Sequence, residues 1–213
     1  MRKVLLIFFL LLGLVANAQT MKMKDVFKAM PDSLLPYLSQ NNRLDFIDFI
    51  ESNMEAKVTN GLGGTSVMHV LTDSYMRLSL NDASELQVRL LPVSTPVDNL
   101  QQIVCVVRTY GTIGQESVVS FYSCLWRPLD MSVKELISVD DLMTRPDTMT
   151  EERYKEVAEI LKPYLVRAEL SADEDCITFQ LSEINISSDD LADVNAVKVL
   201  RKLKWNNNKF NKL

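Results

Sequence analysis

The hydrophobic period of this chain changes at the glycine-rich segment 61–64. Before that segment, apolar residues recur every three or four positions, as on one face of an amphipathic helix. These residues are Leu44, Ile47, Ile50 and Met54, with Phe46 beside them. After it, apolar and polar residues mostly alternate, which is typical of strands with one buried face. A chain that passes from helices to successive strands in this way is expected to fold as an α+β protein.

The alternation predicts about eight strands. They are expected near residues 66–71, 75–80, 85–90, 103–107, 118–126, 166–170, 177–181 and 197–205. The turn at 81–84 joins a half-solvated hairpin, and the acidic turn at 173–175 joins another. Segments 103–107 and 118–126 are apolar on both faces, so we expect both faces to be covered, by helices or by a second sheet.

Helix signals are confined to a few places. Asp25 is expected to begin a short first helix and Asn41 or Asn42 the main one, while segment 61–64 connects that helix to the first strand. Thr148 and Glu151 have the spacing of a capping box, and Pro163 ends the helix they open. One short helical turn is expected after 188–190. The predicted fold class is α+β: a mainly antiparallel sheet of about eight strands, with an N-terminal helical segment and one further amphipathic helix packed on it.

The first eighteen residues have the pattern of a secretory signal peptide. Arg2 and Lys3 precede an apolar run of twelve residues, and the small-x-small sequence 16–18 predicts cleavage between Ala18 and Gln19. The run is shorter than the roughly 20 residues of a membrane-spanning helix. We expect residues 19–213 to form a single α+β domain in the periplasm or outside the cell, without a stable transmembrane span.

Charge excludes some partners. Without Arg2 and Lys3 the chain has 21 basic and 28 acidic residues, a formal charge of −7. Nucleic acid is therefore not expected as a partner. Residues 198–213 differ, with six basic residues and no acidic one. We single out five of them as a possible patch for an anionic partner: Lys198, Arg201, Lys202, Lys204 and Lys209. The alternative is an edge strand that lysines keep from pairing with another chain.

Catalytic signals are weak. His69 is the one histidine, and it falls in a predicted strand with no glycine-flanked serine elsewhere. One histidine disfavours a catalytic zinc site, and segment 61–66 lacks the lysine of a phosphate-binding loop. We predict no catalytic residue, no metal site and no cofactor.

Acidic clusters leave two alternatives open. They lie at Asp140-Asp141, at Asp173-Glu174-Asp175, and at Asp189-Asp190 with Asp193. Two carboxylates about 5 to 9 Å apart can hydrolyse a glycosidic bond, and oxygen-rich loops can bind Ca²⁺. None of these clusters has the spacing of an EF-hand loop. Two of them also have a structural explanation: Asp189-Asp190 lie in the first turn of a helix, where they interact with its dipole, and 173–175 form a solvated turn.

The cysteines are Cys105, Cys124 and Cys176, all on predicted strands. If the intervening turn is centred on 112–113, Cys105 lies opposite Ser120, and Cys124 is about 13 Å further along the strand. That exceeds the roughly 7 Å between the α-carbons of bridged cysteines. Three buried thiols are the expectation.

Two stretches carry a resemblance to a known family. One is DVFKAMPDSLLPYL at 25–38 with NRLDFID at 42–48, and the other is FYSCLWRPL at 121–129. Together with the signal peptide and the length, they resemble a family of uncharacterised secreted proteins from Bacteroidales. The resemblance implies a location in the Gram-negative envelope and no assigned activity.

These observations favour a non-catalytic secreted or periplasmic binding protein, whose partner is a protein or an envelope glycan. The alternatives are a glycan hydrolase that uses carboxylates alone, and a carrier of an apolar ligand between the sheet and its helices.

Overall fold

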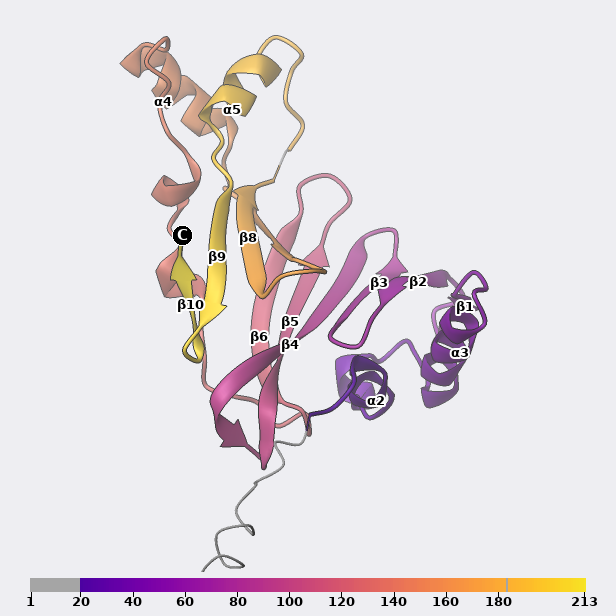
Figure 1. Cartoon of the computed structure of the whole chain (residues 1–213). Helices are drawn as coiled ribbons and strands as arrows, with labels where there is room; N and C mark the ends of the chain where they lie inside the picture. Colours follow the sequence, from indigo (N-terminus) through magenta and orange to yellow (C-terminus); the bar gives the residue numbers. More distant parts are fainter. Residues whose placement is uncertain (1–19, 183) are drawn as a thin grey trace, which may run out of the picture.

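The computed structural model describes residues 20–182 and 184–213 (Figure 1). The predicted signal peptide and its cleavage point between Ala18 and Gln19 lie outside these residues. Within them, ten strands form two antiparallel sheets. The first sheet has the order β1 (Lys57–Thr59), β2 (Thr65–Leu71), β3 (Tyr75–Asn81), β4 (Ser84–Val97), β5 (Leu100–Tyr110), β6 (Glu116–Ser123). The second has the order β10 (Lys209–Lys212), β9 (Arg201–Asn206), β8 (Cys176–Leu181), β7 (Val166–Leu170).

Four α-helices and three short 3₁₀-helices complete the described chain. The α-helices are α2 (Met23–Lys28), α3 (Gln40–Glu51), α4 (Glu151–Ile160) and α5 (Leu191–Val197). The 3₁₀-helices are η1 (Asp32–Leu34), η2 (Lys134–Leu136) and η3 (Val139–Leu142). The last two lie in the long connection between β6 and α4. No helix among the described residues is both long and apolar enough to cross a bilayer.

Both faces of the six-stranded sheet are covered, each by a different kind of element (Figure 1). Even-numbered residues such as Met76 and Val104 pack with Phe27 and Phe46 of α2 and α3. Odd-numbered residues such as Cys105 pack with the four-stranded sheet, α4 and α5. The side chains of a strand alternate between its faces, so one apolar run supplies two separate cores. The apolar central strands therefore have helices on one side and a second sheet on the other.

The α+β class is confirmed, but the expected single sheet of about eight strands is corrected to two sheets with ten strands among the described residues. The first additional strand is β1, which places residues 60–64 in a β1–β2 turn and not in a helix-to-strand connection. The second is β10, which pairs with β9 through the turn at Asn207 and Asn208. Both asparagines have positive φ (51° and 64°), as the inner positions of a tight hairpin turn require. A pair of asparagines between two short apolar patterns was the signal for this hairpin.

The predicted helix starts need correction. Ser39 caps α3, since its hydroxyl accepts a hydrogen bond from the Asn42 amide while the Asn42 side chain accepts from the Ser39 amide. Asn42 is thus the third helical residue of a capping box, not the cap. In the same way Thr150 caps α4 through the Arg153 amide, and Thr148 lies in the preceding turn.

Two further predicted boundaries were wrong. Helix α2 begins at Met23, so Asp25 lies inside its first turn. The predicted C-terminal strand begins at Arg201, because residues 191–197 form the seven-residue helix α5, longer than the single turn expected there. Val194 and Val197 of α5 are fully buried. Burial of this apolar face, and not the local alternation, selects a helix at this place.

Candidate functional site

The four-stranded sheet has one apolar face and one polar face. Ile177, Phe179, Leu181, Leu203 and Trp205 are buried against the six-stranded sheet. Strand alternation places the residues between them on the opposite side. We call this side the outer face. The strand register arranges its residues in rows across the sheet. One row holds Glu169, Thr178 and Lys202, and the next holds Arg167 and Gln180. On the other side of the first row lie the pair Cys176 and Lys204 and then the pair Asn206 and Lys209.

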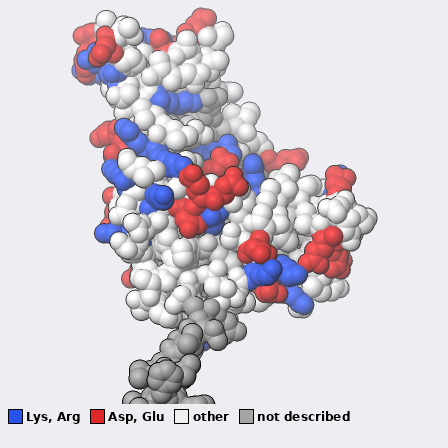
Figure 2. Space-filling view, viewed as in Figure 1, with Lys and Arg blue, Asp and Glu red and all other residues white. Residues whose placement is uncertain are grey.

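A groove lies where the outer face meets the six-stranded sheet. A hollow of about 350 Å³ is lined by Tyr75 and Arg77 of β3 and by Glu169, Thr178 and Lys202 of the outer face. Figure 2 shows acidic and basic side chains next to one another in the middle of this side of the molecule, over β8 and β9. The groove thus collects charges of both signs from strands that are far apart in sequence.

A second hollow continues along the outer face. It has a volume of about 510 Å³ and lies between the β5–β6 turn and the row of Arg167 and Gln180. This row is adjacent to the row of Glu169 and Thr178 that lines the first hollow, since the residues are two apart on each strand. The lining of the second hollow is mainly polar side chains and the backbone of the turn.

An edge strand forms the junction between the sheets. The backbone amide of Leu170 in β7 donates to the Gln87 side chain (2.8 Å), and the amide of Ala168 donates to the Ser117 hydroxyl (2.9 Å). Side chains of the six-stranded sheet thereby satisfy backbone groups that β7 would otherwise leave unpaired. The angle between the sheets, and with it the groove, is held by hydrogen bonds as well as by packing.

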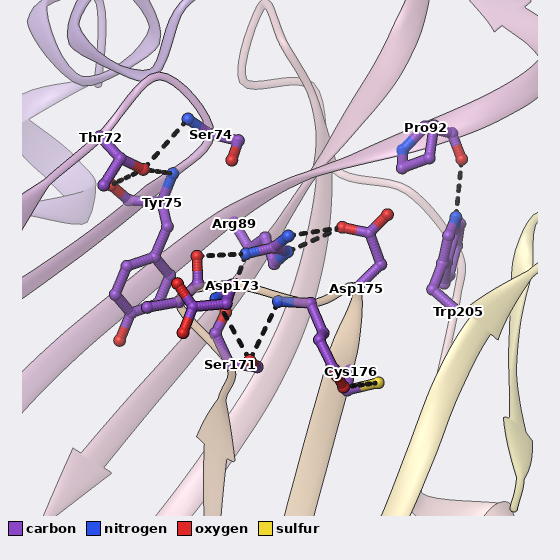
Figure 3. A network of polar contacts seen from close by, with 12 residues as sticks. Thr72, Ser74, Tyr75, Arg89, Pro92, Ser171, Asp173, Asp175, Cys176 and Trp205 are labelled. Atoms are coloured by element: carbon purple, nitrogen blue, oxygen red, sulfur yellow. Dashed lines mark hydrogen bonds and ion pairs between the residues drawn. The ribbon is translucent and has the colours of Figure 1, made fainter.

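Arg89 holds the end of the same junction (Figure 3). Its guanidinium donates to the Asp175 carboxylate at 2.8 Å and to the carbonyl oxygens of Ser171 and Ala172 at 2.8 and 3.0 Å. From β9, the Trp205 indole donates to the Pro92 carbonyl of β4 (2.6 Å). The acidic turn that the sequence suggested to be fully solvated is therefore in part an anchor, through Asp175.

The two basic groups of the first hollow are paired with acidic residues that do not line it. Arg77 donates to Glu85 at 2.8 Å, and Lys202 donates to Glu174. The hydrogen bond from Lys202 lowers the pKa of Glu174. Burial raises the pKa of Tyr75 to about 12, so its hydroxyl stays protonated at neutral pH. These groups offer hydrogen-bond donors and acceptors to a ligand.

The five predicted patch residues are not on one surface. Lys202, Lys204 and Lys209 share the outer face by register. Arg201 points to another part of the chain, where its Nε donates to the Asp141 carbonyl. Lys198 lies before β9 and lines the second hollow. The edge strand is β10, not β9. Three residues of the patch are thus brought together, next to a groove that the sequence did not reveal.

His69 lies at an irregularity of the β2–β3 pairing and is exposed. Its Nε2 lies 2.7 Å from the Ser79 hydroxyl. Among the described residues, no group of three or more histidine, cysteine or acidic side chains could hold a metal ion.

The cysteines are unbridged and buried. Cys105 lies opposite Phe121, one residue from the predicted register, and packs between the sheets. Cys124 packs beneath the N-terminal helices, on the other side of the six-stranded sheet. Burial raises the pKa of both thiols.

The three acidic clusters lie in three separate places, each with local partners. Asp141 accepts hydrogen bonds from Ser138 and Lys212, and these bonds, first the one from the Ser138 backbone, lower its pKa. Arg153 of α4 donates to Asp190 and Asp193 at 2.7 and 2.8 Å and so ties α4 to α5. With Asp175 on Arg89, each cluster has a structural role.

Two packed antiparallel sheets, with α2 and α3 on one side and α4 and α5 on the other, define an α+β protein with a polar groove at the sheet junction. The chain belongs to the family of proteins of unknown function DUF3256, whose model matches residues 15–210. The resemblance to an uncharacterised family is confirmed to that extent.

The fold is similar to that of a solved structure. It is a domain of an uncharacterized protein from Porphyromonas gingivalis W83, with a TM-score of 0.71 and 20% sequence identity over 91% of this chain and all of that chain. At this identity the likeness concerns the fold alone. Comparison with curated proteins finds no similar sequence.

Proposed function

We propose that this protein is a non-catalytic binding protein of the Gram-negative envelope and that the groove between its two sheets is the ligand site. The observation that carries the proposal is the first hollow, where four residues from three strands, β3, β7 and β9, line one concave surface: Tyr75, Arg77, Glu169 and Lys202. Concave sites with a few convergent polar groups are where ligands bind most often.

The rigidity of the junction supports the proposal. The hydrogen bonds of Gln87, Ser117 and Arg89 fix β7 and its following turn on the six-stranded sheet. A ligand that enters such a groove meets side chains already held in position, and this reduces the entropy lost on binding. The protonated Tyr75 and the ion pairs of Arg77 and Lys202 favour recognition over proton transfer.

The envelope location is proposed from the first eighteen residues. Their basic start, short apolar run and small-x-small ending match a secretory signal. A protein or an envelope glycan is the partner that such a location makes available.

Site-specific photocrosslinking in the native cells tests the ligand site. A photoreactive phenylalanine analogue replaces Thr178 in the groove or, as a control, the exposed Asp48 on α3. We expect an adduct from position 178 that the double variant Arg77→Glu, Lys202→Glu reduces by more than about fivefold, since it reverses two charges of the hollow. Adducts of equal yield from both positions, or none from position 178, would refute the groove as the site.

Cell fractionation tests the location. The protein is expected in the periplasmic or extracellular fraction, with an intact mass that begins at Gln19. A cytoplasmic protein that retains residues 1–18 would contradict the envelope proposal while leaving the groove to the crosslinking experiment.

A further inference from the structure

Arg167 is the cation of the second hollow with an unmet hydrogen-bond donor. Its Nε is buried and has no acceptor within the described residues. Among the described residues, Arg167 forms one ion pair, between its Nη2 and Glu169 Oε2. The distance of 3.8 Å is long for an ion pair, and the Glu169 side chain is nearly half exposed, so this contact is weak. A buried donor without an acceptor costs roughly 1–3 kcal/mol, so such a group in a native protein needs an explanation.

The surroundings of Arg167 have the chemistry of a polar ligand site. Gln115 and Gln180 carry amides, and Thr112 and Ser182 carry hydroxyls. Amides and hydroxyls both donate and accept hydrogen bonds, as sugar hydroxyls do. The hollow, of about 510 Å³, has room for a sugar residue.

The charge of this part of the molecule differs from that of the whole. Lys198 lines the hollow, and Lys202 lies in the row of the outer face next to that of Arg167 and Gln180. Lys204 and Lys209 lie in the following rows of the same face. Among the register-paired residues of the outer face, four basic side chains accompany one acidic side chain, Glu169, so the excess of acidic residues in the whole sequence is reversed on this face. Lys204 and Lys209 form no ion pair with the described acidic side chains. A ligand with negative charge gains from this field.

We infer that the second hollow is a subsite for the negatively charged group of an acidic sugar, with Arg167 as its principal ligand and Gln180 and Gln115 bonding the neighbouring hydroxyls. The inference rests on the proposed function, because it names the ligand class of the same groove. A guanidinium presents its N–H groups in a planar fork that matches a carboxylate or a phosphate. A peptide ligand would instead use a free strand edge or apolar pockets for its side chains, and the lining here is mainly polar.

Binding measured by NMR on the mature protein tests the subsite. The probes are trigalacturonate, which carries carboxylates, and glucose 6-phosphate, which carries a phosphate; their neutral counterparts are the trigalacturonate methyl ester and glucose. We expect one or both acidic probes to shift the amide signals of Gly114 and Gln180 and to bind about tenfold tighter than the neutral counterpart. The probe that does so identifies the source of the charge.

Matched variants assign the effect to Arg167. Arg167→Gln is expected to remove the preference for the acidic probe, and Arg167→Lys to keep part of it, since lysine has the charge without the fork. Lys155→Gln, which removes the same charge from an exposed position on α4, should leave the preference unchanged. Unfolding midpoints of the three variants show that each is folded. Equal binding of acidic and neutral probes, or a preference that survives Arg167→Gln, would overturn the inference.

The two proposals fail separately. If no sugar probe binds at millimolar concentration while the Thr178 adduct persists, the acidic-sugar subsite is refuted and the groove remains the ligand site. If the adduct is also absent, the proposed function is refuted with it.

Discussion

The guanidinium of Arg89 on β4 lies 2.8 Å from the carboxylate of Asp175, in the turn that joins β7 and β8. The side chain of Arg89 is only 6% exposed, and its remaining hydrogen bonds go to carbonyl oxygens of the same turn. This contact joins two residues 86 positions apart and fixes the hairpin that forms one wall of the groove.

We expect Arg89→Ala to lower the free energy of unfolding by about 3–5 kcal/mol, because it leaves a partly buried carboxylate and two carbonyls without their donor. Asp175→Asn should cost about 1 kcal/mol, since Asp175 is one-third exposed and asparagine retains an acceptor. Urea unfolding gives both values. Asp173→Asn, in the same turn and exposed, is the control and should stay within about 0.5 kcal/mol of the wild type. An Arg89→Ala variant as stable as this control would disprove the anchor.

The hydrogen bond between Gln87 and the Leu170 amide makes the sheet junction testable by a near-isosteric change. Gln87→Leu keeps the volume and removes the acceptor, so the buried amide of Leu170 loses its partner at a cost of about 1–3 kcal/mol. Faster hydrogen exchange at the Leu170 amide, measured by NMR, should accompany the loss. The exposed Gln101→Leu serves for comparison, and unchanged exchange at Leu170 would contradict the assigned role.

The C-terminal hairpin is part of the core and not a solvated tail. Phe210 is 3% exposed and lies against Trp205, with ring centroids 5.1 Å apart. Phe210→Ala should therefore cost about 3–5 kcal/mol, the usual cost of an aromatic side chain lost from a core. Thermal unfolding measures it, and Leu213→Ala, at a position 76% exposed, should leave the midpoint unchanged. Equal effects of the two substitutions would show that the hairpin does not pack as described.

The thiols of Cys105 and Cys124 should resist both alkylation and pairing. Burial, with the charge of Asp98, raises the pKa of Cys124 to about 11, and burial raises that of Cys105, so neither is a thiolate at pH 8. They also pack on opposite sides of the six-stranded sheet. We expect slow iodoacetamide labelling of the native protein, rapid labelling in urea, and no bond between Cys105 and Cys124 after oxidation, all read by mass spectrometry. A peptide that links these two cysteines would contradict the register.

Tyr75 gives a pH dependence with a definite sign. Its pKa in the folded protein, about 12, is above the ordinary value near 10. The folded state therefore holds the proton more tightly, and the stability due to Tyr75 is complete below pH 10 and is lost between pH 10 and 12. Absorbance at 295 nm should show one tyrosine that ionises near pH 12, and Tyr75→Phe should remove that component. If the variant titrates like the wild type, Tyr75 is not the buried group.

The local sequence pattern predicted the elements that are set by contacts between sequence neighbours or by burial of one apolar face. The hairpins around 81–84 and 173–175 and the helices near 44–51 and 151–160 follow from period and turn residues. Helix starts were misplaced by one to three residues, because Ser39 and Thr150 compete with other polar residues for the cap. Helix α5 was predicted as a single turn, because Val197 fits a strand pattern until its tertiary contacts are known.

The candidate site was predictable only in part. The excess of basic residues after position 197 pointed to Lys202 and Lys204. Nothing in the order of residues paired Lys202 with Tyr75 and Arg77, which lie more than a hundred positions earlier. They line the same hollow only because β7 rests on the six-stranded sheet. No sequence pattern indicated Arg167, because what singles it out is a buried Nε without a hydrogen-bond partner, and burial is known only from the fold.

The sequence by itself determined the α+β class, most strands, the two-sided burial of the central strands, and the pattern of a signal peptide, because periodicity and turn chemistry act over a few residues. The tertiary structure decided that a second sheet covers one face and helices the other, that Asp175 anchors Arg89, and that a groove exists. These features depend on how the apolar faces of distant segments are shared among several possible partners. That choice is made by the total burial and by hydrogen-bond satisfaction of the whole fold.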